Sequence, residues 1–358
     1  MKKALLAAGC IVFSVMSASK VMAADLDFSG LFVFGDSLSD TGNTFTASQG
    51  RFPVPTTTSG QPAYFQGRFS NNLIWVDYFG QQIGKQPVPF VPLQVNPSIG
   101  GQEGINFAFG GAQTGISSTF PGFEGDIPGV LGQVGLLKQN SPNSTLDPNA
   151  IYSIFGGAND YFDAVFSGNV NANTVTGVVG NLSNSISLLA QGNAKNFLVF
   201  NLPDIGETPF AKAQGTAATI ALNGLIQQHN EQLASALGNL RTLNPELNIY
   251  SVDINKLFRD ARENPGQFGF QNVTDACLEG NFLQASNVCD NPNSFLFFDD
   301  VHPSSRAHAL IANTALASVK GGSKSIPEPS TELGILTLAS LGAVRVLKRK
   351  NNKRLVCK

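Results

Sequence analysis

Two short polar runs, one near each end of the sequence, carry the residue types that nucleophilic catalysis needs. Phe34-Gly35-Asp36-Ser37-Leu38-Ser39-Asp40 places a serine just after a short apolar stretch. Asp299-Asp300-Val301-His302-Pro303 places a carboxylate three residues before an imidazole. A serine hydroxyl becomes a nucleophile when a neighbouring base takes its proton, and that base needs a carboxylate to fix its tautomer. The two runs therefore contain the parts of a serine hydrolase.

Two glycine-rich turns could meet the second requirement of acyl transfer, which is to stabilise negative charge on the carbonyl oxygen. Gly104-Ile105-Asn106-Phe107-Ala108-Phe109-Gly110-Gly111-Ala112 and Gly156-Gly157-Ala158-Asn159-Asp160 both contain paired glycines beside an apolar stretch. A glycine N–H can approach a ligand closely because no side chain intrudes, and an asparagine amide is a further donor. Each turn taken singly is equally typical of an ordinary connection between a strand and a helix.

Apolar runs that alternate with helix-like stretches predict the order of the elements. This alternation indicates a parallel sheet with helices on both faces. Ser37 and the glycine turns then lie at the carboxyl ends of the strands, where open α/β sheets bind ligands. The two polar runs bracket nearly the whole pattern, so we expect one domain. The expected strands are Leu31–Phe34, Ile105–Phe109, Ala150–Phe155, Asn196–Asn201 and Leu247–Val252, and the expected helices are Asn72–Ile83, Val130–Lys138, Asn173–Gln191, Thr216–Leu240 and Ser304–Val319.

The composition suits a large core and argues against a nucleic-acid-binding protein. The chain has 358 residues, of which 42% are apolar and 13% are charged, and its formal net charge is −2. A chain of this length can bury a sizeable core in one large domain or two small ones. No basic field is available to bind a polyanion, so nucleic acid is not an expected partner.

The first residues predict export from the cytoplasm. Lys2 and Lys3 precede the apolar run Ala4–Met16, and small residues follow as far as Ala23. A charged region, an apolar region and a small-residue cleavage site in this order are typical of a secretory signal peptide. We therefore expect residues 1–23 to be removed.

Two of the four cysteines are expected to form a disulfide. Cys10 leaves with the signal peptide and Cys357 is the penultimate residue, whereas Cys277 and Cys289 lie twelve residues apart in a Gly/Asn-rich stretch. In an oxidising compartment a local disulfide is expected rather than two free thiols. The sequence contains no C-x-x-C pair, Walker A motif or G-x-G-x-x-G motif, so no metal or cofactor is expected.

Four of these motifs together resemble the GDSL, or SGNH, hydrolase family. They are Gly-Asp-Ser-Leu at Ser37, Asn-Phe-Ala-Phe-Gly-Gly-Ala at Gly111, Gly-Gly-Ala-Asn-Asp at Asn159 and Asp-x-x-His-Pro at His302, in the order of the family's four blocks. The resemblance runs from Leu31 to Val319 and implies a three-layer α/β/α, flavodoxin-like fold with a central parallel sheet. We expect this hydrolase domain to cover residues 29–319.

The resemblance also implies a role for each of these residues. Ser37 is the expected nucleophile, and its backbone N–H is an expected donor to the oxyanion. Gly111 supplies a second backbone N–H and Asn159 a side-chain amide, while His302 is the general base and acid. Gly110 competes with Gly111 for the glycine role, and a count along the motif favours Gly111.

The Asp-x-x-His spacing of the family makes Asp299 the expected orienting carboxylate. A three-residue separation across a turn lets this carboxylate reach Nδ1 of His302 while Nε2 faces Ser37. Activity should then fall as His302 becomes protonated, near the usual imidazole pKa of about 6–7. We expect Asp300 to be solvated or to cap the last helix.

Other polar residues near the motifs are expected to have structural roles, and Trp75 is expected in the core. We expect His229 and His308 to be surface or packing residues. The remaining residues expected to be structural are Asp36, Asp40 and Asp160 and the segment Gly67–Asn71.

The C-terminal region resembles a PEP-CTERM sorting tail of bacteria. A flexible Gly/Ser linker at 320–326 is followed by Pro327-Glu328-Pro329, the mostly apolar stretch Leu333–Val344 and a basic end that reaches Arg354. The resemblance of residues 327–354 implies processing by an exosortase-type transpeptidase and delivery to the cell surface or extracellular matrix. Arg345 shortens the apolar stretch, which favours transient membrane association over stable anchoring.

Together these features predict a secreted carboxylic ester hydrolase, an esterase or lipase that forms an acyl-enzyme on Ser37. Two alternatives stay open: an O-deacetylase of exopolysaccharide or another carbohydrate with the same fold, and a catalytically silent protein that binds the surface or matrix. The expected partners are signal peptidase, exosortase and an ester substrate such as a lipid, a short-chain acyl ester or an acetylated glycan. Specificity is expected to lie in the loops 52–69 and 109–128.

Overall fold

The computed structural model describes residues 26–96, 103–120, 123, 125–141 and 145–321. The expected signal peptide and sorting tail, with Cys10 and Cys357, lie outside these residues, as does all but the first part of the expected linker. In the described part of the chain, no helix has both the length and the apolar character needed to cross a membrane.

A six-stranded parallel sheet forms the centre of the molecule, as the alternating pattern predicts. Its strand order is β2-β3-β1-β6-β7-β8, and every neighbouring pair is parallel. Without the short edge strand β2, this is the flavodoxin-like order, in which ligands bind where the chain changes direction across the first strand. The strands are β1 (Leu31–Gly35), β2 (Val88–Pro89), β3 (Ile105–Asn106), β6 (Ile151–Phe155), β7 (Asn196–Phe200) and β8 (Asn248–Val252).

Strand β3 is shorter than the sequence predicts, although its pairing with β1 continues. The expected strand ends at Phe109, but β3 ends at Asn106. The backbone N–H groups of Phe107 and Phe109 still donate to the carbonyl groups of Val33 and Gly35. The side chain of Asn106 also accepts a hydrogen bond from the N–H of Ala108, which starts the turn early.

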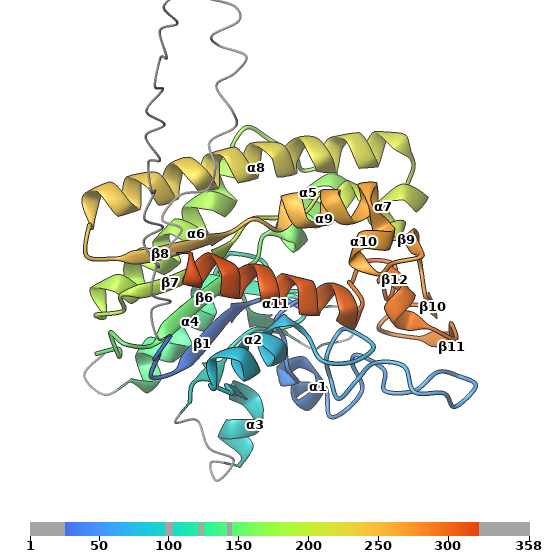
Figure 1. Cartoon of the computed structure of the whole chain (residues 1–358), viewed down its shortest axis with the longest axis horizontal. Coiled ribbons are helices and arrows are strands. Elements are labelled where there is room, and N and C mark those ends of the chain that lie inside the picture. Colours follow the sequence, from blue (N-terminus) through green and yellow to red (C-terminus); the bar gives the residue numbers. More distant parts are fainter. Residues whose placement is uncertain (1–25, 97–102, 121–122, 124, 142–144, 322–358) are drawn as a thin grey trace, which may run out of the picture.

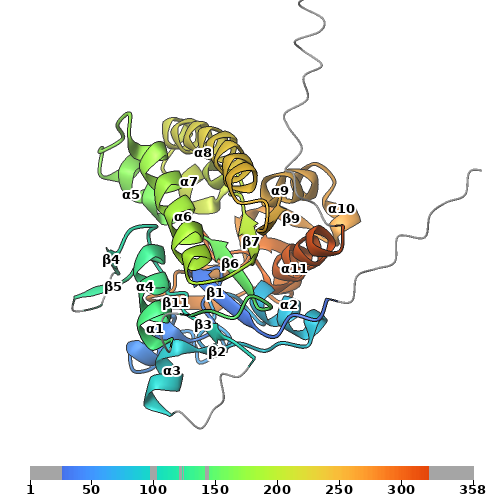
Figure 2. The same ribbon diagram turned by 90° about the vertical axis from the view of Figure 1, so that its left-hand side faces the viewer.

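Helices cover both faces of the sheet and produce the three expected layers. Figure 2 shows α4, α6 and α8 on one side of the strands and α2, α9 and α11 on the other. The bounds of these six helices are α2 (Trp75–Ile83), α4 (Val130–Asn140), α6 (Thr174–Gln191), α8 (Thr216–Leu243), α9 (Ile254–Glu263) and α11 (Ser305–Lys320). The shorter helical elements are α1 (Asn43–Ala47), α3 (Phe90–Val95), α5 (Ala158–Phe166), α7 (Pro209–Ala213), α10 (Pro265–Phe268), η3 (Ile205–Glu207) and η4 (Pro292–Ser294).

Aromatic side chains fill the layer between the sheet and α2, and Trp75 lies in this core as expected. The Trp75 side chain is fully buried, and its ring centroid lies 4.6 Å from that of Phe200. Phe200 in turn stacks on Phe155 at 4.6 Å. Aromatic rings bury large areas and gain from such offset contacts, so this stack fixes β6 and β7 beneath α2.

A second, smaller core lies beside the carboxyl edge of the sheet, and we call it the Tyr64 cluster. It joins the loop between α1 and α2 to the hairpin of β10 (Leu278–Gly280) and β11 (Ala285–Val288), at the right of Figure 1. A disulfide links Cys277 to Cys289 at the base of this hairpin. The buried members of the cluster are Ala63, Tyr64, Cys277, Leu278, Ala285 and Phe298. Two further strand pairs lie near this edge, β4 (Ser117–Thr119) with β5 (Asp126–Pro128) and β9 (Asn272–Ala276) with β12 (Phe295–Phe297).

Candidate active site

The two polar runs from opposite ends of the chain meet at the carboxyl edge of the sheet. Ser37 follows β1, and its Oγ lies 2.8 Å from Nε2 of His302. Nδ1 of the same imidazole lies 2.7 Å from Oδ2 of Asp299. All three residues are buried, and Asp299 is fully inaccessible to solvent. The structure therefore places the three sequence-predicted residues in one hydrogen-bonded line with the geometry of a serine hydrolase triad.

A buried glutamine fixes the turn that presents Ser37. Nε2 of Gln133 donates to the carbonyl of Gly35 at 2.8 Å, and Oε1 of Gln133 accepts from the N–H of Gly35 at 2.9 Å. Position 35 has no room for a side chain, because a Cβ there would lie 2.3 Å from the carbonyl oxygen of Phe155. The close packing of β1 on β6 thus requires the glycine of the Gly-Asp-Ser-Leu motif.

Asp299 accepts four hydrogen bonds within the part of the chain that the structure describes, and one of the donors is a residue that the sequence did not indicate. Oδ1 accepts from the backbone N–H groups of Val301 at 2.8 Å and His302 at 2.5 Å. Oδ2 accepts from the imidazole of His302 and, at 2.5 Å, from the hydroxyl of Tyr64. Because both oxygens have two donors, the carboxylate is held in one orientation.

The negative charge of Asp299 and the positive charge of protonated His302 stabilise each other. Burial disfavours the imidazolium, but the Asp299 carboxylate and the more distant charges of Asp300 and Asp36 outweigh it, so the pKa of His302 is raised. Burial also acts to raise the pKa of Asp299, but its contacts with His302 and Tyr64 lower the pKa below the ordinary value. Asp299 therefore stays ionised across the pH range in which His302 titrates.

Three N–H donors lie around the position that a substrate carbonyl would take beside Ser37. The backbone N–H groups of Ser37 and Gly111 make no hydrogen bond to any residue that the structure describes. The amide of Asn159 uses one hydrogen on the carbonyl of Ala112 at 3.0 Å, which leaves the other for a ligand. Ser37, Gly111 and Asn159 all line the same cavity.

The structure distinguishes the two candidate glycines that the sequence left open. The N–H of Gly110 donates to Oδ2 of Asp40 at 3.0 Å and to Oγ1 of Thr44 at 2.8 Å, so it is occupied. Gly111 has φ = +77°, a conformation that only glycine adopts without strain, and a Cβ there would lie 2.6 Å from the ring of Phe120. The geometry therefore favours Gly111 as the oxyanion donor.

Asp40 is the centre of a polar network that fixes the loop after β1 to the loop after β3. Besides Gly110, its carboxylate accepts from the backbone N–H groups of Gly42, Asn43 and Thr44. Burial raises its pKa in spite of these donors. Asn106 completes the connection, since its amide donates to the carbonyl of Ser39 at 2.7 Å. This arrangement agrees with the structural role expected for Asp40.

The other acidic residues near the triad differ in how they are held. Asp160 accepts from the N–H and hydroxyl of Thr114, and burial raises its pKa to about 6. Asp36 accepts from the N–H of Leu38, and burial raises its pKa to about 7. The Asp36 contact is local, whereas the Asp160 contact joins residues 46 positions apart, and both hold loops in place as expected for structural residues.

Asp300 was expected to be solvated or to cap the last helix, and the second of these alternatives is wrong. Helix α11 begins at Ser305, and its N-cap is Ser304, whose side chain accepts from the N–H of Ala307. Asp300 lies one turn earlier, half-buried against the cavity beside Ser37. Burial and the neighbouring Asp299 charge raise its pKa to about 6.

Neither of the remaining histidines contacts the triad, and both are packing residues rather than surface residues. His229 is fully buried in α8, where Nδ1 lies 2.8 Å from the hydroxyl of Tyr161. His308 is fully buried in α11 and accepts from the N–H of Trp75. Burial lowers the pKa of each to about 3, so both are neutral at physiological pH.

Two cavities meet at Ser37 and differ in size and polarity. The smaller one, of about 40 Å³, is lined by residues that follow β1, β6, β7 and β8, and its wall includes apolar side chains such as Leu202 and Ile205. The larger one, of about 360 Å³, opens over the nucleophile. Its lining combines polar side chains with five phenylalanines: Phe69, Phe120, Phe162, Phe210 and Phe282.

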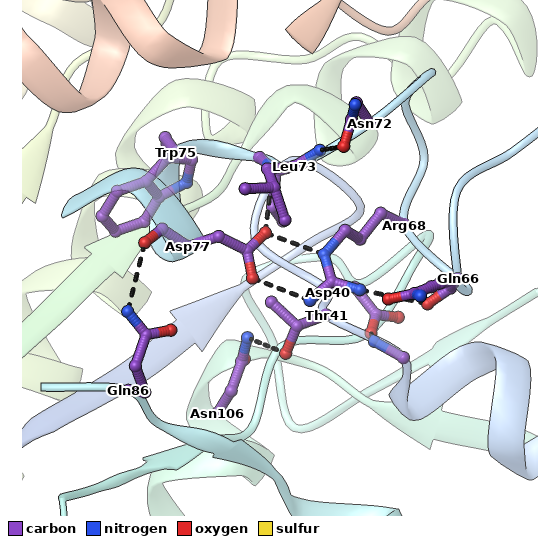
Figure 3. Close-up of polar contacts among 12 residues, drawn as sticks. Asp40, Thr41, Gln66, Arg68, Asn72, Leu73, Trp75, Asp77, Gln86 and Asn106 are labelled. Atoms are coloured by element: carbon purple, nitrogen blue, oxygen red, sulfur yellow. Dashed lines mark hydrogen bonds and ion pairs between the residues drawn. The ribbon is translucent and has the colours of Figure 1, made fainter. Parts of the chain in front are cut away.

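The segment Gly67–Asn71 supports the histidine loop, in agreement with its expected structural role, and it also contributes to the cavity wall. Arg68 forms a bidentate ion pair with Asp77 of α2, with both N–O distances at 2.7 Å (Figure 3). The next residue, Phe69, packs its ring 5.1 Å from the imidazole of His302. Ser70 donates to the carbonyl of Pro303 at 3.0 Å.

Sequence reasoning missed the hairpin of β10 and β11 as part of the site. Its turn places Phe282 over the cavity, with its ring 5.8 Å from that of Phe69 and 6.5 Å from the imidazole of His302. The two loops expected to set specificity do contribute, through Phe69 and Phe120. The two cysteines that bracket the hairpin were the available signal, since a disulfide fixes the ends of a loop.

Comparison with known proteins places the chain in a family. The chain matches the family model described as GDSL-like lipase/acylhydrolase over residues 31–315. An uncharacterized protein from the trpE-trpG intergenic region of Pseudomonas putida is 30% identical over 345 residues, covering 88% of this chain and 52% of that protein. The chain thus spans about half the length of this relative.

Two further proteins are similar over most of their own length. A GDSL esterase/lipase of Arabidopsis thaliana is 28% identical over 289 residues, covering 76% of this chain and 88% of that protein. The crystal structure of the lipase/acylhydrolase from Enterococcus faecalis aligns with a TM-score of 0.36 at 15% identity, covering 84% of this chain and 99% of that one. The family match extends from β1 into α11 and includes all the site residues described above. This chain therefore belongs to the GDSL-like lipase/acylhydrolase family of serine ester hydrolases.

Proposed function

We propose that this protein hydrolyses carboxylic esters through an acyl-enzyme on Ser37. The observation that carries the proposal is the hydrogen-bonded line from Ser37 Oγ to His302 Nε2 at 2.8 Å and from His302 Nδ1 to Asp299 at 2.7 Å. The raised pKa of His302 makes it a stronger base than a free imidazole, and buried Asp299 keeps the Nδ1–H tautomer that leaves Nε2 free to accept a proton.

In the first half of the reaction, Ser37 Oγ attacks the acyl carbon while its proton passes to Nε2 of His302. The carbonyl oxygen becomes an oxyanion, which accepts hydrogen bonds from the N–H groups of Ser37 and Gly111 and from the amide of Asn159. The tetrahedral intermediate collapses as the bond to the alcohol breaks. His302 gives its proton to the departing alcohol, and the acyl group stays on Ser37 as an ester.

The second half repeats these steps with water. His302 takes a proton from a water molecule, whose oxygen attacks the acyl carbon, and the same three donors stabilise the second oxyanion. The bond to Ser37 breaks, and Oγ recovers its proton from His302. The carboxylic acid leaves, and the free enzyme is restored without a metal or cofactor.

The lining of the larger cavity supports a substrate with an apolar acyl chain. Rings of Phe120 and Phe282, with centroids 5.4 Å apart, contact each other beside the nucleophile. Phe162 lines both cavities and so lies between them. An alkyl chain that leaves water for such a surface gains about 0.8 kcal/mol per methylene, whereas an acetyl group offers almost nothing to bury.

We therefore expect kcat/KM for p-nitrophenyl esters to rise with acyl-chain length from acetate through butyrate toward octanoate. Each added methylene should raise kcat/KM by up to about fourfold until the cavities are filled. The increase should shrink in Phe162→Ala, while acetate hydrolysis changes little. A profile that falls steadily from acetate onward would contradict an apolar acyl site.

A second candidate function is the removal of acetyl groups from a polysaccharide. Amide and hydroxyl side chains from Gln113, Thr119 and Asn281 line the larger cavity beside the phenylalanines, and such groups can bond to sugar hydroxyls. Acetate released from an acetylated polysaccharide, with little hydrolysis of butyrate or octanoate esters, would favour this function over the first.

We also propose that the enzyme acts outside the cytoplasm, after cleavage by signal peptidase and processing by an exosortase. The signal-like residues 1–23 and the sorting-like residues 327–354 support this location, as does the Cys277–Cys289 disulfide, because such bonds persist in oxidising compartments. Antibody detection in cell fractions should find the mature chain at the surface or in the medium. A variant expressed without residues 1–23 should instead stay in the cytoplasm. Finding the full chain in the cytoplasm would contradict the proposal.

A further inference from the structure

We propose that Tyr64 is a positioning residue of the triad, which acts on His302 through Asp299. This inference rests on the proposed function, since it assumes that Asp299 orients the catalytic base. Tyr64 OH donates to Oδ2 of Asp299 at 2.5 Å, and the same oxygen accepts from Nδ1 of His302 at 2.7 Å. A phenol hydroxyl thus contacts the atom on which the orientation of the imidazole depends.

Among the residues that the structure describes, Tyr64 is the one donor to this carboxylate that comes from a distant part of the chain. The other three donors are the N–H of Val301 and the N–H and imidazole of His302, which lie within three residues of Asp299. Those three bonds fix Asp299 only relative to its own loop. The bond from Tyr64, 235 residues away in sequence, fixes the carboxylate relative to the loop between α1 and α2.

The side chain of Tyr64 is itself held rigidly. It is 3% exposed, and its ring meets that of Phe298 edge-on, with centroids 5.2 Å apart at 86°. It belongs to the Tyr64 cluster, which the Cys277–Cys289 disulfide closes on one side. Four residues further along the loop, the Arg68–Asp77 ion pair of Figure 3 fixes the chain to α2.

The surroundings of Tyr64 also keep it protonated. Burial and the adjacent Asp299 carboxylate raise its pKa well above the ordinary tyrosine value, so the phenol remains a donor across the working pH range. Two roles follow from this bond. The bond keeps Oδ2 directed at Nδ1, and it lowers the basicity of Oδ2, so the proton stays on Nδ1 when His302 becomes an imidazolium.

The test is Tyr64→Phe, which removes the hydroxyl and retains the ring that packs in the cluster. Hydrogen bonds to charged groups are stronger than those between neutral groups, so the loss of this bond should lower kcat by about 10- to 100-fold. KM should stay within about twofold, because Tyr64 lines neither of the two cavities at Ser37. The matched control is Tyr152→Phe, which removes the hydroxyl of another buried tyrosine and should retain kcat. That hydroxyl donates to the carbonyl of Asp147, which precedes β6, whereas the site lies at the carboxyl end of the strands.

A double-mutant cycle with Asp299→Asn separates action through Asp299 from a general effect on folding. Single-turnover acylation of each variant by a p-nitrophenyl ester gives the rates. Tyr64→Phe should slow the parent enzyme and have no further effect in the Asp299→Asn background.

Two outcomes would overturn the inference while leaving the triad intact. In one, Tyr64→Phe retains parental kcat although Asp299→Asn is impaired. In the other, Tyr64→Phe lowers the rate by the same factor in both backgrounds, which would make its effect independent of Asp299. Full activity of Asp299→Asn would instead reject the proposed triad, and the inference with it.

Discussion

Ser37→Ala should lower kcat by on the order of 10⁶-fold for any ester that the parent enzyme hydrolyses, because no other group can form the acyl-enzyme. The hydroxyl is 2.8 Å from the base that activates it. A fluorophosphonate probe, which reacts with activated serines, should label the parent protein at Ser37 and leave Ser37→Ala unlabelled. Mass spectrometry of the labelled peptide gives the modified residue.

Ser39 provides the matched control for this substitution. It lies two residues along the same turn and is likewise buried, but its Oγ accepts from the indole N–H of Trp75 at 3.1 Å and makes no hydrogen bond to His302. Ser39→Ala should label normally and retain most of its activity. If the folded parent protein is neither labelled nor active on esters, the protein is a catalytically silent member of the fold, and the proposed function is wrong.

The sequence predicts the layers of the fold well, because each main strand is a buried apolar run followed by a helix. The bounds of β1 and β6 differ from the expected ones by a single residue at one end. The short strand β2 was not expected, since Val88–Pro89 has neither the length nor the alternation of a strand. It forms only because Val88 meets Ile105 of β3 at the sheet edge, a tertiary contact that no local pattern records.

Ser37 was predictable because parallel topology brings the carboxyl ends of strands to one edge, and Asp299 and His302 were predictable because their spacing resembles the family's Asp-x-x-His block. The choice between Gly110 and Gly111 was not, since it depends on which N–H is already bonded. The N–H of Gly110 donates to Asp40 and Thr44, and these residues lie about seventy positions earlier in the chain. Tyr64 illustrates the same limit, because nothing around it in the sequence indicates that its hydroxyl reaches Asp299.

Asp299→Asn should lower kcat by roughly 10⁴-fold, by comparison with the equivalent change in other serine hydrolases. An amide at this position can donate to Nδ1, which favours the tautomer whose Nε2 is protonated and cannot accept the proton of Ser37. The change should also alter the pH dependence. Asp299 is the strongest influence that raises the pKa of His302, so without it burial dominates and the pKa falls.

The sign of the pH effect follows from which form of His302 is active. Neutral imidazole is the base, so activity rises as pH increases through the His302 pKa. In the parent enzyme this acid limb should lie above the ordinary imidazole value of about 6.5, higher than the sequence alone suggests. In Asp299→Asn the limb should move to lower pH, together with the large loss of kcat.

Asp300→Asn is the matched control for Asp299→Asn, because the two carboxylates are adjacent in sequence but differ in what they contact. Asp300 also raises the pKa of His302, but only through its charge, and it makes no hydrogen bond to the imidazole. Its removal should therefore move the acid limb slightly to lower pH and leave the kcat plateau near the parent value. Profiles of kcat/KM against pH from about 4 to 10 give the position of the acid limb in the free enzyme, and kcat over the same range gives the plateau. A large loss of kcat in Asp300→Asn, with a small one in Asp299→Asn, would show that Asp300 orients His302. That result would contradict the assignment of this role to Asp299, which is made from its 2.7 Å contact with Nδ1.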